Sequence, residues 1–360
     1  MDSNHSIIKR LGEQLYCNGK RFSSVYGWKE LERWKKLRNN YKGKRVFLIA
    51  NGPSLNMTPL YLLKDEYTIV FNRFKLMLER LNYQPSFYMI MDNKVILDNT
   101  DVIAEFTEKS ELAFVPDILK AERVSVRDLL PKRDNLMYLF QEPMKFSNNL
   151  PFFKIGNSVT FGAYQILRYL GFSEVFVVGN DMNYVVHQTA DVVKNVKFEG
   201  GVVQDIKSTK DDDPNHFDPR YFGKGQTYHQ PTAFVTDRMF KNLDLVAKEY
   251  KKSGVKIVNA GYNSMVQSFP KQDFYEALGY SREKIDELFD DLVRSKGLES
   301  KEWLFEKAVL KEDVWDEELN VAVVPMEMAT AVVKKKVLDY LPLGPYRDKL
   351  YFVNRKLIKL

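Results

Sequence analysis

Short apolar runs alternate with amphipathic stretches along the middle of this 360-residue chain. The runs are continuous and rich in β-branched and aromatic residues, a pattern typical of strands buried on both faces of a parallel sheet. Strands are expected at residues 46–50, 67–71, 86–91, 112–115, 136–140, 174–178 and 255–258. Helices are expected at 58–64, up to residue 81, at 158–170 and at 236–252. The pattern therefore predicts an α/β domain.

Two further segments flank this domain, and one interrupts it. Apolar positions three or four residues apart predict helices between residues 4 and 44, and again in an acidic amphipathic stretch that follows residue 271. Residues 185–230 show little periodicity and hold three of the four histidines. So long a structureless stretch in a compact domain is usually a functional lid or disordered. We predict a basic helical N-terminal segment (1–44), a catalytic domain (45–268) with a lid (185–230), and a helical C-terminal extension with a basic tail (269–360).

Polar residues follow several of the predicted strands at the point where each strand ends. The first strand runs into Asn51-Gly52-Pro53-Ser54, where Gly52 permits close approach of a ligand and Ser54 can cap a helix. Later strands are followed by Asn72, Asp92, Asp181 and Asn259. In open α/β sheets ligands bind at the carboxyl ends of the strands. We therefore expect a polar ligand site there, although the first loop alone would also suit a tight turn without a ligand.

The helix expected at 158–170 begins with a second candidate ligand group. Asn157 or Ser158 can cap it, and Gly171 can end it. Its first amides and its dipole favour an anion, and the hydroxyls of Ser158 and Thr160 could assist. This helix end is predicted to bind a phosphate.

Composition limits the class of protein and its compartment. With 44% hydrophobic and 13% aromatic residues, the chain can bury a sizeable core. The single cysteine, Cys17, rules out an intrachain disulfide framework, which fits a reducing compartment. The N-terminal residues lack an apolar stretch of signal-peptide length, and no run of about 18 apolar residues occurs. We therefore expect a cytoplasmic protein without a membrane span.

The net charge of +6 is concentrated at the two ends. Residues 9–45 contain 12 Lys or Arg against 3 Glu, and residues 334–360 contain 8 against 2 acidic residues. Basic segments that also carry Trp28 and Trp34 suit an anionic membrane surface or a polyanionic substrate, and equally a solvated face. Nucleic acid is not expected as a partner, since the usual binding motifs are missing.

The absence of several well-known sequence motifs limits the reactions that the protein could catalyse. Neither His-Glu-x-x-His nor Cys-x-x-Cys occurs, so no metal site is predicted. The first loop is not Gly-x-Gly-x-x-Gly, and a P-loop is missing, which disfavours dinucleotide redox chemistry and P-loop hydrolysis. What remains is recognition of a nucleotide by amides and a carboxylate, with histidine or tyrosine for proton transfer.

A set of motifs in fixed order resembles those of known nucleotide-dependent transferases. It resembles bacterial lipooligosaccharide sialyltransferases, motility-associated flagellin glycosyltransferases, and the 6-hydroxymethylpterin diphosphokinase MptE-like proteins, which share one core. The resemblance covers about residues 45–268. The motifs are Ile49 to Leu55, Phe71-Asn72, Thr160 to Tyr164, Gly179-Asn180-Asp181 and Asn263-Ser264.

The resemblance implies a fold, a reaction and residue roles. The fold would be Rossmann-like with a mostly parallel sheet, a variant of the GT-A type. The reaction would be inverting transfer from a CMP-activated sugar without a metal or other cofactor. Asn51, Gly52 and Ser54 would lie in the donor phosphate loop, Asn72 would bind donor or base, and Asp181 the ribose. Asp92, Ser158, Thr160 and Asn259 are further candidates for donor binding.

The resemblance also implies candidates for the proton-transfer residues. Tyr184 stands near the place of tyrosines that hydrogen-bond the departing phosphate, but Asn183 occupies the position where the sialyltransferases have tyrosine. His229 fits the place of the catalytic histidine before the last long helix, while His216-Phe217 resembles a neighbouring His-Tyr. Both histidines therefore stay candidates for the base.

We predict a glycosyltransferase that moves a sialic-acid-like (nonulosonic) or related sugar to a surface glycan, a lipid-linked acceptor or a flagellin-like protein, as in lipopolysaccharide biosynthesis. The basic ends could hold it peripherally at the inner membrane. One alternative is an ATP-dependent pterin diphosphokinase, for which Asp92 and Asp181 are the possible Mg²⁺ ligands. Another is a nucleotide-binding protein that has lost catalysis.

Overall fold

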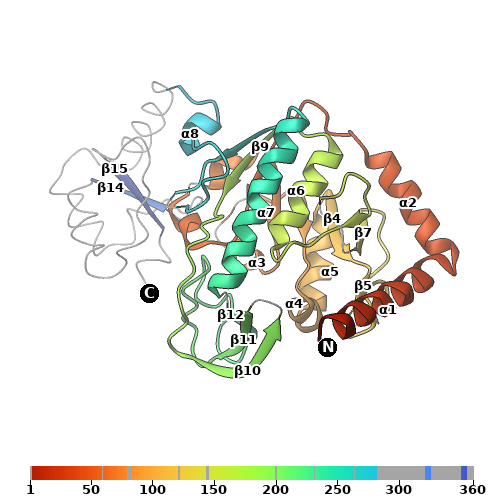
Figure 1. Ribbon diagram of the computed structural model, residues 1–360. Helices are drawn as coiled ribbons and strands as arrows, with labels where there is room; N and C mark the ends of the chain where they lie inside the picture. The colour runs from red at the N-terminus through yellow and green to blue at the C-terminus, as the bar shows by residue number, and fades with distance from the viewer. Residues whose placement is uncertain are drawn as a thin grey trace.

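An eight-stranded parallel sheet forms the centre of the molecule (Figure 1). The computed structural model describes residues 2–58, 60–78, 81, 83–120, 122–142, 146–198, 201–230, 232–262, 264–281, 321–325 and 350–354. Within them every neighbouring pair of strands in this sheet is parallel. The predicted Rossmann-like α/β class is confirmed. The strand order is β13 (Lys256–Asn259), β9 (Glu174–Val178), β1 (Arg45–Ile49), β2 (Tyr67–Phe71), β3 (Phe87–Met89), β4 (Leu112–Pro116), β7 (Leu136–Gln141), β8 (Phe152–Phe153).

Alternate side chains of each strand enter two separate cores, as the pleat requires. In β1, Val46 and Leu48 face one core, and Phe47 and Ile49 face the other. The first core is covered by α6 (Val159–Leu170), α7 (Ala233–Lys252) and part of α2 (Val25–Leu37). The second is covered by η1 (Pro53–Met57), η2 (Leu60–Leu63), α3 (Lys75–Leu78), α4 (Asn93–Asp98), α5 (Thr100–Lys109) and α8 (Phe274–Ala277). Both faces of the strands are thus apolar, which explains their continuous hydrophobic runs.

The N-terminal helices α1 (Asp2–Phe22) and α2 are fastened to the sheet by buried polar contacts. The guanidinium of Arg21 is fully buried and bonds both carboxylate oxygens of Asp117, at 2.6 and 2.9 Å, and an oxygen of Glu142 at 2.7 Å. Trp34 lies in the first core, and its Nε1 donates to the carbonyl of Tyr138 at 2.9 Å. Arg21 of α1 and Trp34 of α2 therefore anchor these two helices to the sheet that follows them.

The segment 185–230 contains regular structure, so the expectation that it lacks any was wrong. It forms the antiparallel sheet of β10 (Ala190–Phe198), β11 (Gly201–Ser208) and β12 (Thr227–Gln230). These strands escaped the sequence pattern because Lys, Asp, Asn and Gln interrupt their valines, so neither face reads as apolar. Whether the segment acts as a lid stays a prediction.

Smaller elements complete the described chain. The helix expected at 58–64 is instead the 3₁₀ turn η2, and a second 3₁₀ turn, η1, precedes it. Two short antiparallel pairs join β5 (Ile118–Leu119) to β6 (Val124–Ser125) and β14 (Val321–Pro325) to β15 (Leu350–Asn354), and η3 spans Val126–Asp128. The predicted amphipathic helix with Ile285 and Leu288 lies outside the described residues. Among the helices described, none combines the length and apolar content needed to cross a membrane.

Candidate functional site

The loops after β1 and β9 meet at the point where the strand order reverses. The chain leaves β1 toward β2 on one side, whereas β9 is added later on the other side of β1. In open α/β sheets such a switch point forms the crevice in which ligands bind. The amide of Gly52 donates to the carbonyl of Gly179 at 2.8 Å, so the two loops are held together by their backbones. The first strand's loop therefore lies where a ligand is expected.

Ser54 and Asp181 form the main side-chain contact between these loops. The Ser54 amide donates to Oδ2 of Asp181 at 2.8 Å, and its hydroxyl donates to Oδ1. A Cβ at position 52 would collide with the Asp181 carboxylate, which explains the glycine there. Burial raises the pKa of Asp181, while the hydrogen bonds from Ser54 and the positive charge of protonated His216 act in the opposite direction. The structure thus brings Gly52, Ser54 and Asp181 into contact.

Part of the predicted lid covers the β1 loop. The amide of Phe217 donates to the carbonyl of Asn51 at 3.0 Å, and Nδ2 of Asn56 donates to the carbonyl of Phe217 at 2.9 Å. Nδ2 of Asn51 donates to the hydroxyl of Tyr221 at 2.9 Å. Residues 217–221 therefore pack against the carboxyl edge of the sheet.

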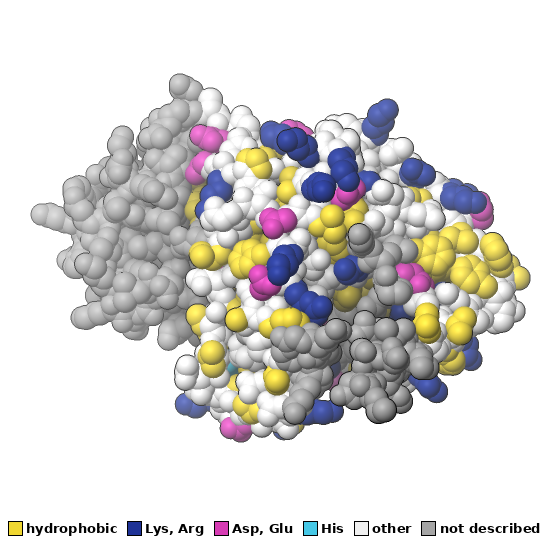
Figure 2. Space-filling view, viewed as in Figure 1, with side chains coloured by type: hydrophobic (Ala, Val, Ile, Leu, Met, Phe, Trp, Pro, Cys, Tyr) yellow, Lys and Arg dark blue, Asp and Glu magenta, His cyan; other side chains and the backbone are white. Residues whose placement is uncertain are grey.

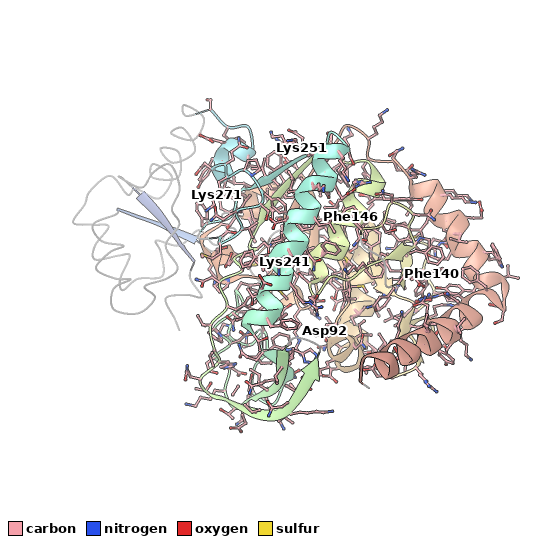
Figure 3. All side chains as sticks on the ribbon, viewed as in Figure 1. Asp92, Phe140, Phe146, Lys241, Lys251 and Lys271 are labelled. Atoms are coloured by element: carbon pink, nitrogen blue, oxygen red, sulfur yellow. The ribbon has the colours of Figure 1, made fainter. Side chains whose placement is uncertain are left out.

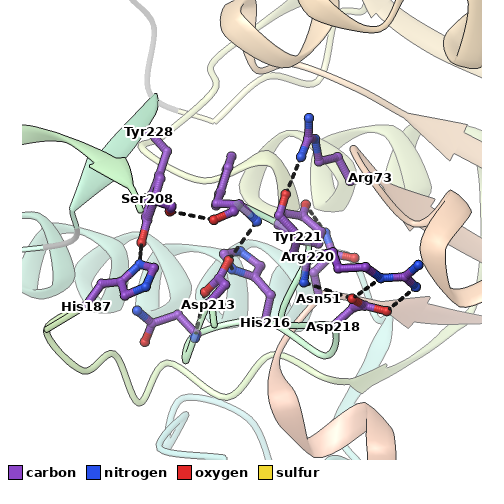
Figure 4. Close-up of polar contacts among 12 residues, drawn as sticks. Asn51, Arg73, His187, Ser208, Asp213, His216, Asp218, Arg220, Tyr221 and Tyr228 are labelled. Atoms are coloured by element: carbon purple, nitrogen blue, oxygen red, sulfur yellow. Dashed lines mark hydrogen bonds and ion pairs between the residues drawn. The ribbon is translucent and has the colours of Figure 1, made fainter. Parts of the chain in front are cut away.

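His216 is held in this segment by a buried carboxylate and a ring stack (Figure 4). Its Nδ1 lies 2.8 Å from Oδ2 of Asp213, whose side chain is fully buried. Asp213 also accepts from the amides of Asn215 at 2.9 Å and Phe222 at 3.1 Å. The imidazole lies flat on the ring of Tyr221, with centroids 3.9 Å apart. Because the carboxylate requires a proton on Nδ1, Nε2 is the basic atom of the ring.

The other two histidines of the segment lie elsewhere. His229 is on β12, where Nδ1 pairs with Asp205 of β11, and its side chain is 59% exposed. His187 is buried between the hydroxyl of Tyr228 and Asp212, whose carboxylate lies 2.9 Å from Nε2. The structure therefore brings His216 to the β1 loop and places His229 on the three-stranded sheet.

Tyr184 follows Asp181 in the loop after β9 and packs against the first core. Burial, with a smaller contribution from the negative charge of Asp181, raises the pKa of Tyr184 to about 12. Its hydroxyl therefore keeps its proton at neutral pH and can donate a hydrogen bond.

Asn72 has the features of a ligand-binding residue. It follows β2 with a positive φ of 49°, which places it in the left-handed region of the backbone. Within the described part of the chain, its Oδ1 and that of Asn51 are buried acceptors without a hydrogen-bond donor. Buried polar atoms are normally satisfied, so these two oxygens are suited to a donor group from a ligand.

Asp92 and Asn259 make local backbone contacts. Asp92 caps α4, accepting from the amides of Lys94 at 2.9 Å and Val95 at 3.1 Å; it lies at the start of that helix (Figure 3). Asn259 is buried, donates to the carbonyl of Val266 at 3.1 Å and accepts from the amide of Gly261 at 3.1 Å. Their ligand-binding roles stay predictions.

Ser158 and Thr160 lie at the start of α6. Ser158 accepts from the amide of Thr160, and the two hydroxyls are 2.7 Å apart. Because α6 leads into β9 and runs against the strand direction, this helix end lies at the same edge of the sheet as Asp181. In the described part of the chain, no group of three or more His, Cys, Asp or Glu is arranged to hold a metal ion.

Comparison with known protein families agrees with the motif-based resemblance. Residues 23–187, just under half of the chain, match the family described as 6-hydroxymethylpterin diphosphokinase MptE-like, so the predicted resemblance to that core is confirmed there. Among solved structures, the chain is similar to the MAf glycosyltransferase from Magnetospirillum magneticum AMB-1, with 17% identity and a TM-score of 0.39. That match covers 87% of this chain and 50% of the other, so the chain spans about half the length of that glycosyltransferase. No curated protein matches the chain.

Proposed function

We propose that the protein is a transferase that moves a group from a nucleotide-activated donor to an acceptor hydroxyl, with His216 as the general base. The observation that carries the proposal is the Asp213–His216 pair, which lies beside the β1 loop because the next residue, Phe217, donates its amide to the carbonyl of Asn51. A carboxylate that fixes the proton on Nδ1 leaves Nε2 to accept the proton of the acceptor hydroxyl.

The group transferred is proposed to be a sugar, with a CMP-activated sialic-acid-like donor. The acceptor oxygen gives its proton to His216 and bonds to the anomeric carbon as the bond from that carbon to the CMP phosphate breaks, which inverts the carbon. The neutral hydroxyl of Tyr184 donates to the departing phosphate, and Asp181 binds the ribose. The acceptor is proposed to be a surface glycan, lipid-linked or carried on a protein.

A second candidate, an ATP-dependent diphosphokinase, is favoured by the family match over residues 23–187. The same base would then activate a hydroxyl for attack on phosphorus. Kinase sites hold Mg²⁺ through one or two carboxylates plus substrate phosphates. Asp92 and Asp181 follow strands that are three positions apart in the sheet, so either one alone, with the phosphates, would hold an ion. Both already accept backbone N–H groups, which leaves their other lone pairs for an ion.

Thermal unfolding with a panel of nucleotides separates the two candidates. We expect CMP to raise the melting temperature without Mg²⁺, because ligand at 100 times its Kd stabilises by about 2.7 kcal/mol. UDP and ATP serve as the comparison, each with and without Mg²⁺. Strong stabilisation by ATP with Mg²⁺ and none by CMP would favour the diphosphokinase.

Substitution of the histidines tests the base. His216→Ala should lower turnover by about 10² to 10⁴, the usual contribution of a general base, with CMP affinity nearly unchanged. Asp213→Asn should also slow turnover and shift its pH profile, whereas His229→Ala is the matched control and should stay near wild type. If instead His229→Ala is inactive and His216→Ala transfers sugar normally, the assignment fails and His229 is the base.

A further inference from the structure

Four large apolar side chains are exposed along the second half of α1 and at the start of α2. Leu11, Leu15, Val25 and Trp28, called here the elbow patch, are between 59% and 73% exposed. Figure 2 shows hydrophobic side chains gathered over this region, at the right of the view. Such a cluster on a surface usually marks a contact site.

Phe22 links the two parts of the elbow patch to the core. Leu11 and Leu15 are four residues apart and share a helix face with Phe22, seven residues beyond Leu15. The ring of Phe22 meets that of Trp28 edge to face at 5.2 Å. On its other side Phe22 packs on Phe140, 6.1 Å away, beneath the patch (Figure 3). The ring of Trp28 is therefore connected to the core through Phe22.

Basic side chains lie near the elbow patch, where Tyr16 follows Leu15 in the sequence. Lys20 and Arg123 lie 5.9 and 5.4 Å from the ring of Tyr16, and exposed Lys29 follows Trp28. The segment 9–45 has 12 Lys or Arg against 3 Glu. A second copy of the chain would bring an equally basic surface against this one, which disfavours self-association. An anionic surface complements both the charge and the apolar groups.

The elbow patch lies on the same edge of the sheet as the candidate site. Arg21 fastens α1 to Asp117 and Glu142, which directly follow the carboxyl ends of β4 and β7. The β1 loop is at that edge too, four strands from β7 in the sheet order. With strands about 4.8 Å apart, the separation along the edge is roughly 19 Å.

We propose that the elbow patch docks the protein on membranes that contain anionic lipid. Leu11, Leu15, Val25 and Trp28 enter the headgroup layer, while Lys20, Lys29 and Arg123 contact lipid phosphates. Docking there would bring the carboxyl edge of the sheet close to the lipid surface. The inference does not depend on the activity proposed above, because it is tested by binding alone.

Sedimentation with vesicles tests it on the full chain. Phosphatidylcholine vesicles with about 30% phosphatidylglycerol are compared with pure phosphatidylcholine at low and physiological salt, where the Debye length is about 8 Å. We expect binding to the anionic vesicles that weakens with salt. Leu15→Ser with Trp28→Ser should lower the partition coefficient at least about tenfold, since each side chain loses its apolar contact with lipid. The control, Leu97→Ser with Val193→Ser, removes two exposed apolar groups elsewhere and should bind like wild type.

Several results would overturn the proposal. The proposal fails if the wild-type protein does not bind anionic vesicles. It also fails if the elbow variant (Leu15→Ser with Trp28→Ser) binds as well as the control double variant while both keep the wild-type melting temperature. If the wild-type protein binds polyglutamate but not vesicles, and the elbow variant does not bind polyglutamate, the partner is an acidic protein instead. A dimer detected by light scattering that the elbow variant abolishes would identify a second copy.

Discussion

Replacement of Asp181 by asparagine separates the cost of its buried charge from the value of its hydrogen bonds. Both carboxylate oxygens accept from Ser54, one from the amide and one from the hydroxyl. In Asp181→Asn the amide oxygen can still accept from the Ser54 amide, and Nδ2 can donate to the Ser54 hydroxyl. The substitution therefore keeps the shape of the contact and removes only the negative charge. Asp181→Ala removes both hydrogen bonds as well.

The two variants should shift stability in opposite directions at neutral pH. Burial raises the pKa of Asp181, so the folded protein disfavours the charged carboxylate. The contribution of Asp181 to stability is then most favourable below the unfolded pKa of about 3.9, and it is lost as pH rises through the folded pKa. Asp181→Asn should consequently unfold at a higher temperature than wild type at pH 7. Asp181→Ala leaves two groups of Ser54 unpaired, at about 1–3 kcal/mol each.

Thermal unfolding from about pH 4 to pH 8 measures the cost of the buried charge. The difference in melting temperature between the asparagine variant and wild type should shrink as pH falls. The asparagine variant should also lose the stabilisation by nucleotide, since a carboxylate binds ribose hydroxyls better than an amide does. A gain in stability with a loss of binding is typical of functional residues. An asparagine variant that is as unstable as the alanine variant, or a difference independent of pH, would refute the reasoning.

Two further substitutions test contacts that position the site. Gly52→Ala should destabilise the protein by about 1–3 kcal/mol in denaturant unfolding, because the new Cβ collides with the Asp181 carboxylate. The control Gly12→Ala has open space around its Cβ and should not destabilise the protein. Equal losses of stability in the two variants would contradict the collision. Arg21→Met leaves Asp117 buried without its cation and should cost about 3–5 kcal/mol in the same assay. Lys241→Met removes an exposed ion pair and should unfold like wild type, so similar losses would show that the Arg21 contacts have no special role.

The central sheet was predictable because its strands are apolar on both faces. Each of β1, β2, β4, β7 and β9 fills two cores, so a continuous run of hydrophobic residues identifies it without knowledge of its neighbours. The strands β10 to β12 give no such pattern, since exposed Val192 and Val193 are adjacent, between Asp191 and Lys194, and fit neither the strand nor the helix period. The short strand β8 has only two residues, too few for any periodicity.

The candidate site was predictable in its parts and not in its contacts. Strand ends gave Ser54 and Asp181, yet the two lie 127 positions apart, and only the strand order brings them together. Asp213 was missed because it stands in a run of three aspartates. The fold separates them: Asp211 binds the amide of Lys224 at 2.7 Å, Asp212 binds Thr189, and Asp213 is buried against His216. The spacing of three residues between Asp213 and His216 was the available sequence signal.

The choice of base shows why a histidine paired with a carboxylate is insufficient evidence by itself. Three such pairs occur in the described segment: His187 with Asp212, His216 with Asp213, and His229 with Asp205. A catalytic base needs a carboxylate that water does not screen and a ring edge that an acceptor can reach. His187 fails the second condition, because its side chain is only 2% exposed. His229 fails the first condition, because its side chain is 59% exposed on the three-stranded sheet and Asp205 is partly exposed to water as well. The His216 ring is 19% exposed above a fully buried carboxylate, so it meets both conditions at the edge where the loops of β1 and β9 join.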